Sequence, residues 1–281
     1  MYWVGRKIDG GSYHVQALDL IKRQIYIGTL RPEERFPPER KLSETLGISR
    51  VTLREALKNL ETHGFIVAVR GAKGGTFVGN DEAINTIAQQ RVFTQPDQVW
   101  RSLEFLRANI VLASLLACER RTPSDLEALR ASVQKMGKAS SGGELREAQY
   151  LFCAGLCDAS MNPYLKEATE TALEGIFHPI FEDSLRDLAI AKAGKCLSIV
   201  DAVDEQDNEA SALRTSEFVD GIAAYIKALM MGGSVSSVFQ RSLVLGSSMK
   251  PPGSVIGALP SLLSDPSNSP SRGDRGTARA R

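Results

Sequence analysis

The chain has 281 residues, of which 43% are hydrophobic, and at roughly 100–200 residues per domain this length predicts two domains. No stretch approaches the roughly 18 uninterrupted apolar residues of a membrane span, and the N-terminus lacks the apolar segment of a signal peptide, so we expect a cytoplasmic protein without a membrane partner. The net charge is +1, but residues 1–80 contain thirteen Lys and Arg against eight Asp and Glu, a net charge of +5. This asymmetry favours an anionic partner, with nucleic acid as the first candidate.

The N-terminal part is predicted to begin with three helices. Apolar side chains recur at spacings of three and four in residues 13–28, which predicts an amphipathic helix. Pro38 suits the first turn of a second helix, which stops at Gly47. Ser49 is a favourable N-cap for a third helix, which ends at Gly64.

A β-hairpin is predicted to follow the third helix. Residues 65–69 and 76–78 are short runs rich in β-branched and aromatic side chains. The basic, glycine-rich segment 70–75 joins them as a mobile tip. Three helices followed by a hairpin wing are typical of a winged helix-turn-helix, and we expect this DNA-binding domain to span residues 1–80.

The remainder of the chain is predicted to be almost entirely helical. We expect a polar linker over 81–97 and an all-α helical bundle of about six helices over 98–231, with breaks near Pro163 and Pro179. Gly, Ser and Pro dominate residues 232–281, which predicts a disordered tail. The expected fold class is therefore mostly α, with an N-terminal winged helix-turn-helix and a C-terminal bundle.

The start of the third helix is the predicted DNA-reading element, because the corresponding residues of a helix-turn-helix face base edges in the major groove. Ser49 begins this segment. Arg50 and Arg54 lie four residues apart on one face, where a guanidinium can bind guanine O6 and N7 or a phosphate. Thr52 can contact a thymine methyl group or hydrogen-bond a base. Each arginine taken alone fits a solvated helix face, but the order of the elements favours DNA binding.

Further DNA contacts are expected outside the third helix. Arg40, at the start of the second helix, is placed to hold the DNA backbone. Lys73 and Gly74 in the wing can approach a minor groove, because glycine removes steric bulk. The predicted partner is thus a double-stranded DNA operator with distributed contacts.

Three segments resemble the GntR family of transcription regulators: FPPERKL at 36–42, LGISRVTLREAL at 46–57 and GTFV at 75–78. The resemblance covers about residues 13–80 and implies a homodimer that binds a short palindromic operator. It also implies DNA contacts at the positions of Arg40, Arg50, Thr52 and Arg54, and an approach to the minor groove at Gly74.

The helical part resembles, over about residues 98–225, the FadR-type effector domain (FCD) of that family. Arg107, Phe152 and the segment 159–165 carry the likeness. The resemblance implies a small-molecule effector site. Many members of this branch hold a divalent metal through an Asp-x-x-x-His pair and two later histidines, which leave positions open for a carboxylate effector.

Here those metal-ligand positions are occupied by other residues. Aligned by eye, they fall on Gln149, Cys153, Cys196 and Phe218. The chain contains only three histidines, so a site of one carboxylate and three imidazoles is impossible. We expect no metal and no cofactor, and a pocket lined by these four residues in which Arg107 meets an acid group of the effector.

The cysteines leave a second interpretation open. Cys153 and Cys196 could converge as soft-metal ligands or as a redox pair. Buried cysteine more often behaves as a small hydrophobic residue, and this is the reading we favour. His178, which precedes Pro179, is expected to be a structural or surface histidine.

These observations predict a DNA-binding transcription regulator, a repressor whose effector weakens DNA binding. An enzyme is disfavoured, because the chain lacks a G-x-S-x-G elbow, a Walker loop, a dinucleotide-binding fingerprint and an H-E-x-x-H motif. The alternative is a DNA-bound architectural or recruiting protein with a degenerate, ligand-free effector domain. That alternative predicts no ligand-dependent change in operator affinity.

Overall fold

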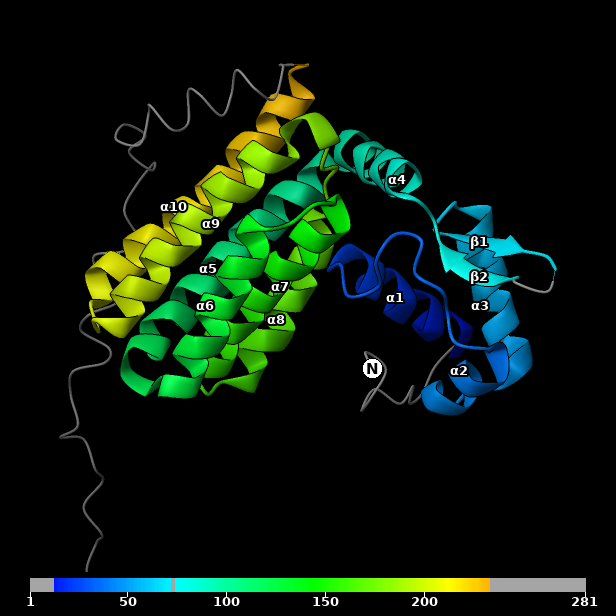
Figure 1. The fold of residues 1–281 in the computed structure, drawn as a ribbon, viewed down its shortest axis with the longest axis horizontal. Helices are drawn as coiled ribbons and strands as arrows, with labels where there is room; N and C mark the ends of the chain where they lie inside the picture. The colour runs from blue at the N-terminus through cyan, green and yellow to red at the C-terminus, as the bar shows by residue number, and fades with distance from the viewer. Residues whose placement is uncertain (1–12, 72–73, 233–281) are drawn as a thin grey trace, which may run out of the picture. The chain divides into compact units, whose positions relative to one another are not determined.

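The computed structural model describes residues 13–71 and 74–232 (Figure 1). Within these ranges the chain forms ten helices and one two-stranded sheet. Lys73 and, apart from Gly232, the predicted tail lie outside the described residues. None of the helices in the described ranges is long and apolar enough to cross a membrane.

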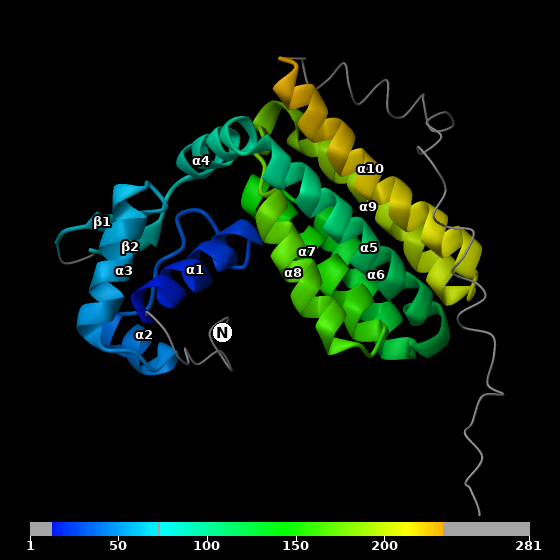
Figure 2. The ribbon, with the colours of Figure 1, turned by 180° about the vertical axis from the view of Figure 1, so that it is seen from behind.

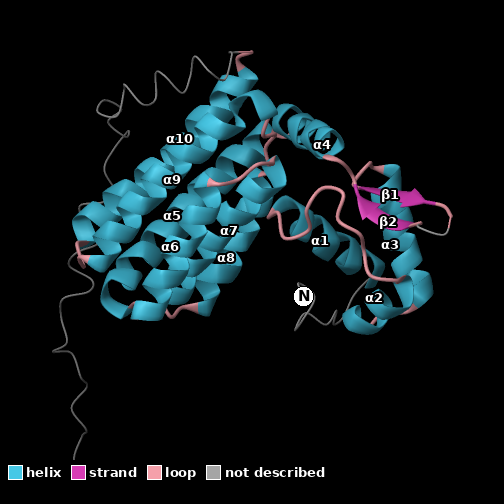
Figure 3. Ribbon diagram, viewed as in Figure 1, coloured by secondary structure: helices cyan, strands magenta, loops and turns pink. Residues whose placement is uncertain are grey.

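The first elements follow the predicted order (Figure 3): α1 (Tyr13–Tyr26), α2 (Glu39–Leu46), α3 (Arg50–Thr62), β1 (Ile66–Val69) and β2 (Gly75–Val78). Gly47 has a φ of 71°, a left-handed conformation that ends α2 and turns the chain toward α3. Ser49 is extended, and its Oγ accepts a hydrogen bond from the backbone N–H of Thr52 (3.0 Å). The predicted helix-turn-helix is confirmed, and local signals fix both sides of its turn.

The hairpin is attached to the helices through its backbone. β1 and β2 pair antiparallel, with Ile66 opposite Val78. The segment before α2 adds a further connection, because the N–H of Phe36 donates to the carbonyl of Thr76 (2.8 Å). The predicted wing is therefore held on a second side, next to the start of α2.

The segment expected to be a polar linker is largely helical, since α4 spans Asp81–Thr94. The side chain of Asn80 caps this helix by accepting from the N–H of Ala83 (2.9 Å), and two acidic residues in the first turn suit the positive end of the helix dipole. One narrow stripe of the helix is buried: Ile84, Ala88 and Val92. The connection between the two parts is thus a capped helix with its own packing face.

Six helices form the predicted C-terminal bundle (Figures 1 and 2): α5 (Pro96–Arg120), α6 (Pro123–Gly137), α7 (Gly142–Ala159), α8 (Pro163–Ile176), α9 (Glu182–Asp204) and α10 (Asn208–Met230). α5 packs against α7, α8 and α10, whereas α9 packs against α6 and α10. Pro163 begins α8, and Pro179 lies between α8 and α9, so both predicted breaks are confirmed.

Buried apolar side chains form two clusters. One cluster joins α1 to α4 and the hairpin, and the other joins α5 to α10. Phe177, which directly follows α8, belongs to the first cluster, where its ring centroid lies 4.4 Å from that of Tyr26. Ile27 and Val92 belong to the second cluster. Each part of the chain therefore contributes side chains to the core of the other.

Candidate nucleic-acid interface and effector site

The N-terminal half of α3 has one exposed face, and the opposite face of the helix is buried. Its inner side chains belong to the first core cluster: Leu53, Ala56, Leu57 and Leu60. Arg50, Val51 and Arg54 are exposed on the outer side. Because the core fixes the helix, these outer side chains project from positions set by helix geometry. Such a face can present cations to bases and phosphates.

Two of the predicted DNA-contacting arginines have glutamate partners at the surface. Arg54 Nε donates to Glu39 Oε2 (2.7 Å), and Arg40 Nη1 donates to Glu44 Oε1 (3.1 Å). The two arginine side chains are 68% and 69% exposed. Ion pairs this exposed contribute little free energy in water, so DNA phosphates can displace the glutamates.

The other predicted contacts at the start of α3 are partly engaged in holding the helix. The hydroxyls of Ser49 and Thr52 lie 2.8 Å apart, and Ser49 also caps the helix. Val51, between Arg50 and Thr52, is 67% exposed. The sequence interpretation missed Val51, although a β-branched residue at this position suits contact with a thymine methyl group.

The wing requires glycine at position 74 for backbone closure. The N–H of Gly74 donates to Gly71 O (2.8 Å), and a Cβ on Gly74 would lie 2.3 Å from Val69 O. Arg35 donates to the carbonyl of Gly74, and its guanidinium lies over the Phe77 ring at 5.8 Å. Hairpin geometry therefore explains this glycine without DNA, and Arg35 adds a cation to the wing that the sequence interpretation missed.

The structure brings predicted pocket residues together inside the bundle, with a buried lysine among them. Gln149 and Cys153 of α7 and Cys196 of α9 are all buried. Lys192, one turn before Cys196, is 6% exposed and donates to Gln149 Oε1. Burial, together with the positive charge of Arg146, lowers the pKa of Lys192 to about 8.

These residues do not fit a divalent metal. Burial raises the pKa of the Cys153 and Cys196 thiols, whereas metals bind the thiolate form. The Lys192 ammonium already places a positive charge beside them. Among the residues that the structure describes, no three His, Cys, Asp or Glu side chains are grouped so that they could hold a metal ion. The donor set therefore disfavours the soft-metal interpretation.

The two remaining predicted pocket residues lie in different surroundings. Phe218 of α10 is buried edge-on against Phe152, with ring centroids 6.0 Å apart. Arg107 of α5 contacts the hydroxyl of Ser216 and the carboxylate of Asp220, both on α10. The charge of Arg107 is thus paired at a half-exposed position, and its contacts are not with the α7 residues of the predicted pocket.

A groove of about 540 Å³ lies where α4 meets α5, and it is a second candidate place for a ligand. It is lined by Thr94, Gln95, Pro96, Asp97, Gln98, Arg101, Ser102, Phe105 and Thr171. None of the predicted pocket residues lines this groove.

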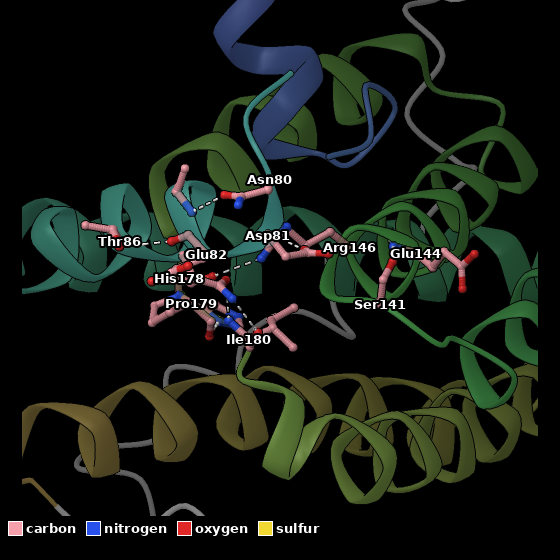
Figure 4. Close-up of polar contacts among 12 residues, drawn as sticks. Asn80, Asp81, Glu82, Thr86, Ser141, Glu144, Arg146, His178, Pro179 and Ile180 are labelled. Carbon is pink, nitrogen blue, oxygen red and sulfur yellow. Dashed lines mark hydrogen bonds and ion pairs between the residues drawn. The ribbon is translucent and has the colours of Figure 1, made fainter. Parts of the chain in front are cut away.

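Besides Lys192, a second basic side chain is buried: Arg146 of α7 lies beside the start of α4 (Figure 4). Its Nη2 is 3.9 Å from Asp81 Oδ1, too far for a hydrogen bond, and neither atom has a hydrogen-bond partner among the described residues. Arg146 Nη1 donates to the carbonyl of His178 at 3.5 Å. Burial, with the nearby charge of Lys192, lowers the pKa of His178 to about 3. His178 is therefore a buried, neutral, structural histidine.

Several contacts join the bundle to the winged helix-turn-helix and to α4. Arg23 of α1 forms an ion pair with Glu174 of α8 (3.0 Å). Asn85 of α4 makes two hydrogen bonds to the backbone of Ile180, one donated by its amide (2.8 Å) and one accepted from the N–H of Ile180 (3.0 Å). The connector between α8 and α9 is thus tied by two hydrogen bonds to α4, the helix that follows the hairpin.

Comparisons with known proteins agree with this arrangement. The family model described as bacterial regulatory proteins, gntR family, matches residues 14–78, and the FCD domain model matches residues 106–221. The HTH-type transcriptional regulator LutR of Bacillus subtilis is 32% identical over 143 residues, which are 50% of this chain and 64% of LutR. The HTH-type transcriptional repressor NagR of the same organism is 35% identical over 82 residues, 29% of this chain and 33% of NagR.

Among solved structures, E. coli McbR/YncC is similar with a TM-score of 0.45 and 22% identity, over 79% of this chain and 100% of that one. The aligned part of the present chain spans less than two thirds of LutR and a third of NagR. The fold and the site define a winged helix-turn-helix joined to a helical effector-type bundle. The chain belongs to the gntR family of bacterial regulatory proteins, in the branch with an FCD domain, which is a family of transcription regulators and not of enzymes.

Proposed function

We propose that this chain binds a specific duplex DNA site and regulates transcription in response to a small molecule. In this proposal, residues 1–80 bind the DNA, residues 81–97 connect the two parts, and residues 98–231 bind the effector and dimerise. The observation that carries it is the exposed N-terminal face of α3, which projects from a helix whose other side is fixed in a core. The net charge of +5 in the DNA-binding part supports an anionic partner.

The functional unit is a homodimer that acts as a repressor. One recognition helix contacts only a few base pairs. Two recognition helices related by a two-fold axis bind the two half-sites of a palindrome together, and therefore more tightly than either helix binds one half-site. Repression is supported by the similarity of this chain, over 82 residues, to NagR, which is an HTH-type transcriptional repressor. Effector binding then lowers DNA affinity by favouring a conformation in which the two recognition helices no longer fit both half-sites.

The test is selection of bound sequences from a random duplex pool by the purified full chain at a fixed salt concentration, because phosphate contacts make affinity strongly salt-dependent. Recovery of one palindromic sequence is the expected result. The half-site spacing would also report the distance between the two recognition helices. Recovery of unrelated sequences, with no shared site, would contradict the proposal.

One observation favours the architectural alternative. Cys153, Cys196 and Phe218 are at most 1% exposed, so the centre of the predicted pocket is closely packed. A protein that recruits partners without an effector would keep the same DNA affinity with every small molecule tested. A ligand that lowers the affinity for the selected duplex at least tenfold would exclude this alternative.

A further inference from the structure

Arg35 lies on the outer face of the wing, although it precedes α2 in the chain. The segment before α2 runs alongside β2, where Arg35 forms an antiparallel bridge with Phe77. The next residue, Phe36, is 4% exposed, whereas Arg35 is exposed. Successive side chains of an extended segment point to opposite faces. The side chain of Phe36 therefore enters the core, and that of Arg35 lies on the solvent face of the wing.

The outer face continues from Arg35 across both strands of the hairpin. Residues that lie directly opposite each other in antiparallel strands share a face, and Phe77 lies opposite both Arg35 and Val67. Val67 is 51% exposed. The guanidinium of Arg35 lies 5.8 Å from the centroid of the Phe77 ring, a cation–π contact that holds the charge against the wing. The wing thus carries a cation on an otherwise apolar row of side chains.

Glycine backbone surrounds the guanidinium at the base of the wing tip. Arg35 donates to the carbonyl of Gly74, and a Cβ on Gly75 would lie only 2.8 Å from Arg35 Nε. A Cβ on Gly71 would meet no atom within 4 Å, so this glycine faces open space. Around these glycines the wing presents backbone with a guanidinium beside it. A minor groove about 6 Å wide can admit such a narrow surface.

The charge of Arg35 is available to an outside anion. Among the residues that the structure describes, Arg35 forms no ion pair, whereas Arg54 of α3 is paired with Glu39. Residues 65–80, which contain the hairpin, include two bases and no Asp or Glu. DNA therefore meets no acidic side chain of the hairpin beside Arg35, and no glutamate has to be displaced before this guanidinium binds.

We propose that Arg35 reads the width of the minor groove next to the half-site that α3 contacts, and thereby gives the protein a preference for A·T pairs there. Runs of A·T pairs narrow the minor groove, and the more negative potential of a narrow groove attracts arginine. A G·C pair instead places the guanine 2-amino group, a hydrogen-bond donor, in this groove, where it opposes a guanidinium. This inference rests on the proposed function, because it names a specificity-determining residue for the same DNA site.

The experiment changes the minor groove without changing the major groove. The selected duplex is made with short blocks beside each half-site that consist of A·T, G·C or inosine·cytosine pairs. Inosine lacks the 2-amino group of guanine, so an inosine·cytosine pair presents the major-groove edge of G·C and a minor-groove edge like that of A·T. Each duplex is titrated with the full chain at one fixed salt concentration.

Three variants separate minor-groove reading from other roles. Arg35→Met removes the charge and keeps a long side chain, and Arg35→Lys keeps the charge but loses the planar fork. Arg40→Met is the matched control, since Arg40 is an exposed arginine that is expected to hold the DNA backbone. The melting temperature of each variant is measured as well, because Arg35 also contacts Phe77 and Gly74.

The wild type is expected to bind the duplex with G·C blocks about tenfold more weakly than the duplexes with A·T or inosine·cytosine blocks. Arg35→Met should bind all three alike, Arg35→Lys should keep part of the preference, and Arg40→Met should weaken all three by a common factor. If Arg35→Met loses all DNA binding, Arg35→Lys decides, because only a reduced preference in that variant supports the inference.

Three results would overturn the inference. The wild type could bind the three duplexes equally, or it could bind the inosine·cytosine duplex as weakly as the G·C duplex, which would place the preference in the major groove. Arg35→Met could also weaken all three duplexes by one factor and keep the wild-type preference, which would make Arg35 a purely structural residue of the wing.

The inference and the proposed function fail separately. A selected site without an Arg35-dependent preference would remove the inference and leave the proposed function. If selection returns no shared sequence, the proposed function fails, and the same variants are titrated with unselected A·T, G·C and inosine·cytosine duplexes. An Arg35-dependent preference among these duplexes would leave the minor-groove reading in place, and its absence would remove that as well.

Discussion

Acid should destabilise this protein through one histidine. His178 is buried between α8 and α9, its ring lies 5.1 Å from that of Tyr225, and its Nδ1 is 3.0 Å from the carbonyl oxygen of Pro179. Because a carbonyl only accepts, Nδ1 carries the proton and the neutral ring donates. Burial, with the charges of Lys192 and Arg146, lowers its pKa from 6.5 to about 3.

The direction in which the unfolding free energy changes with pH follows from proton binding to His178. Between pH 6.5 and pH 3 the unfolded chain binds a proton at His178 that the folded protein does not bind, so stability is lost as the pH falls through this window. Each unit of pKa difference corresponds to about 1.36 kcal/mol. Lowering the pH from 7.5 to 5 should therefore remove about 2 kcal/mol of unfolding free energy through this group alone.

The assay is urea unfolding of the wild type and of His178→Phe at several pH values between 7.5 and 5. Phenylalanine keeps a ring beside Tyr225 but cannot titrate, so the variant should lose about 2 kcal/mol less than the wild type over this range. His63→Gln is the control, since His63 is an exposed histidine at the end of α3. Parallel pH profiles for the wild type and His178→Phe would show that His178 does not cause the loss of stability in acid.

Four further predictions concern DNA contacts, core packing and metals. Arg50→Ala should lose about 1–3 kcal/mol of binding to the selected duplex, whereas Lys58→Ala, later on the same helix, should lose much less; equal losses in a titration would contradict a base-reading role. Glu39→Gln removes the charged partner of Arg54 and should tighten DNA binding by about 0.2–1 kcal/mol. Weaker binding would contradict the idea that a DNA phosphate displaces Glu39 from Arg54. Phe177→Ala deletes a buried ring and should cost about 3–5 kcal/mol in urea unfolding, and a loss below about 1 kcal/mol would mean that Phe177 is not part of the core. A chelator should leave the melting temperature unchanged, and a clear drop would reveal a metal site.

The helix-turn-helix could be predicted from sequence because short-range chemistry determines it. Gly47 takes a left-handed conformation that other residues adopt only with strain, and Ser49 caps the next helix with its own side chain. Both effects depend on neighbours within a few residues. The order of the helices and the hairpin could therefore be derived without knowledge of tertiary contacts.

α4 was expected to be a polar linker because its apolar signal is small. Only Ile84, Ala88 and Val92 are buried, and polar residues surround them. Their four-residue spacing and the cap at Asn80 were visible in the sequence, but the hydrogen bonds between Asn85 and the backbone of Ile180, 95 residues later, were not. Short helices gain most of their stability from such tertiary contacts, which a linear sequence does not show.

The interior of the bundle could be predicted only in part. Gln149, Cys153 and Cys196 were named from the resemblance, whereas Lys192 was not, although it lies one turn from Cys196 on the buried face of α9. The flexible side chain of a lysine on such a face can extend to solvent. In this structure the Lys192 ammonium instead donates to Gln149 Oε1 inside the bundle, a contact that the sequence does not show. The contacts of Arg107 with Ser216 and Asp220 could not be predicted either, because these partners lie more than a hundred residues later in the chain.

The proposed function requires sequence-specific DNA binding, which is measured by titration of two duplexes. The full chain is titrated with the selected duplex and with a scrambled duplex of equal length and composition, at one fixed salt concentration near physiological ionic strength. The selected duplex should be bound at least about a thousandfold more tightly than the scrambled duplex. Equal affinity for the two duplexes would contradict it.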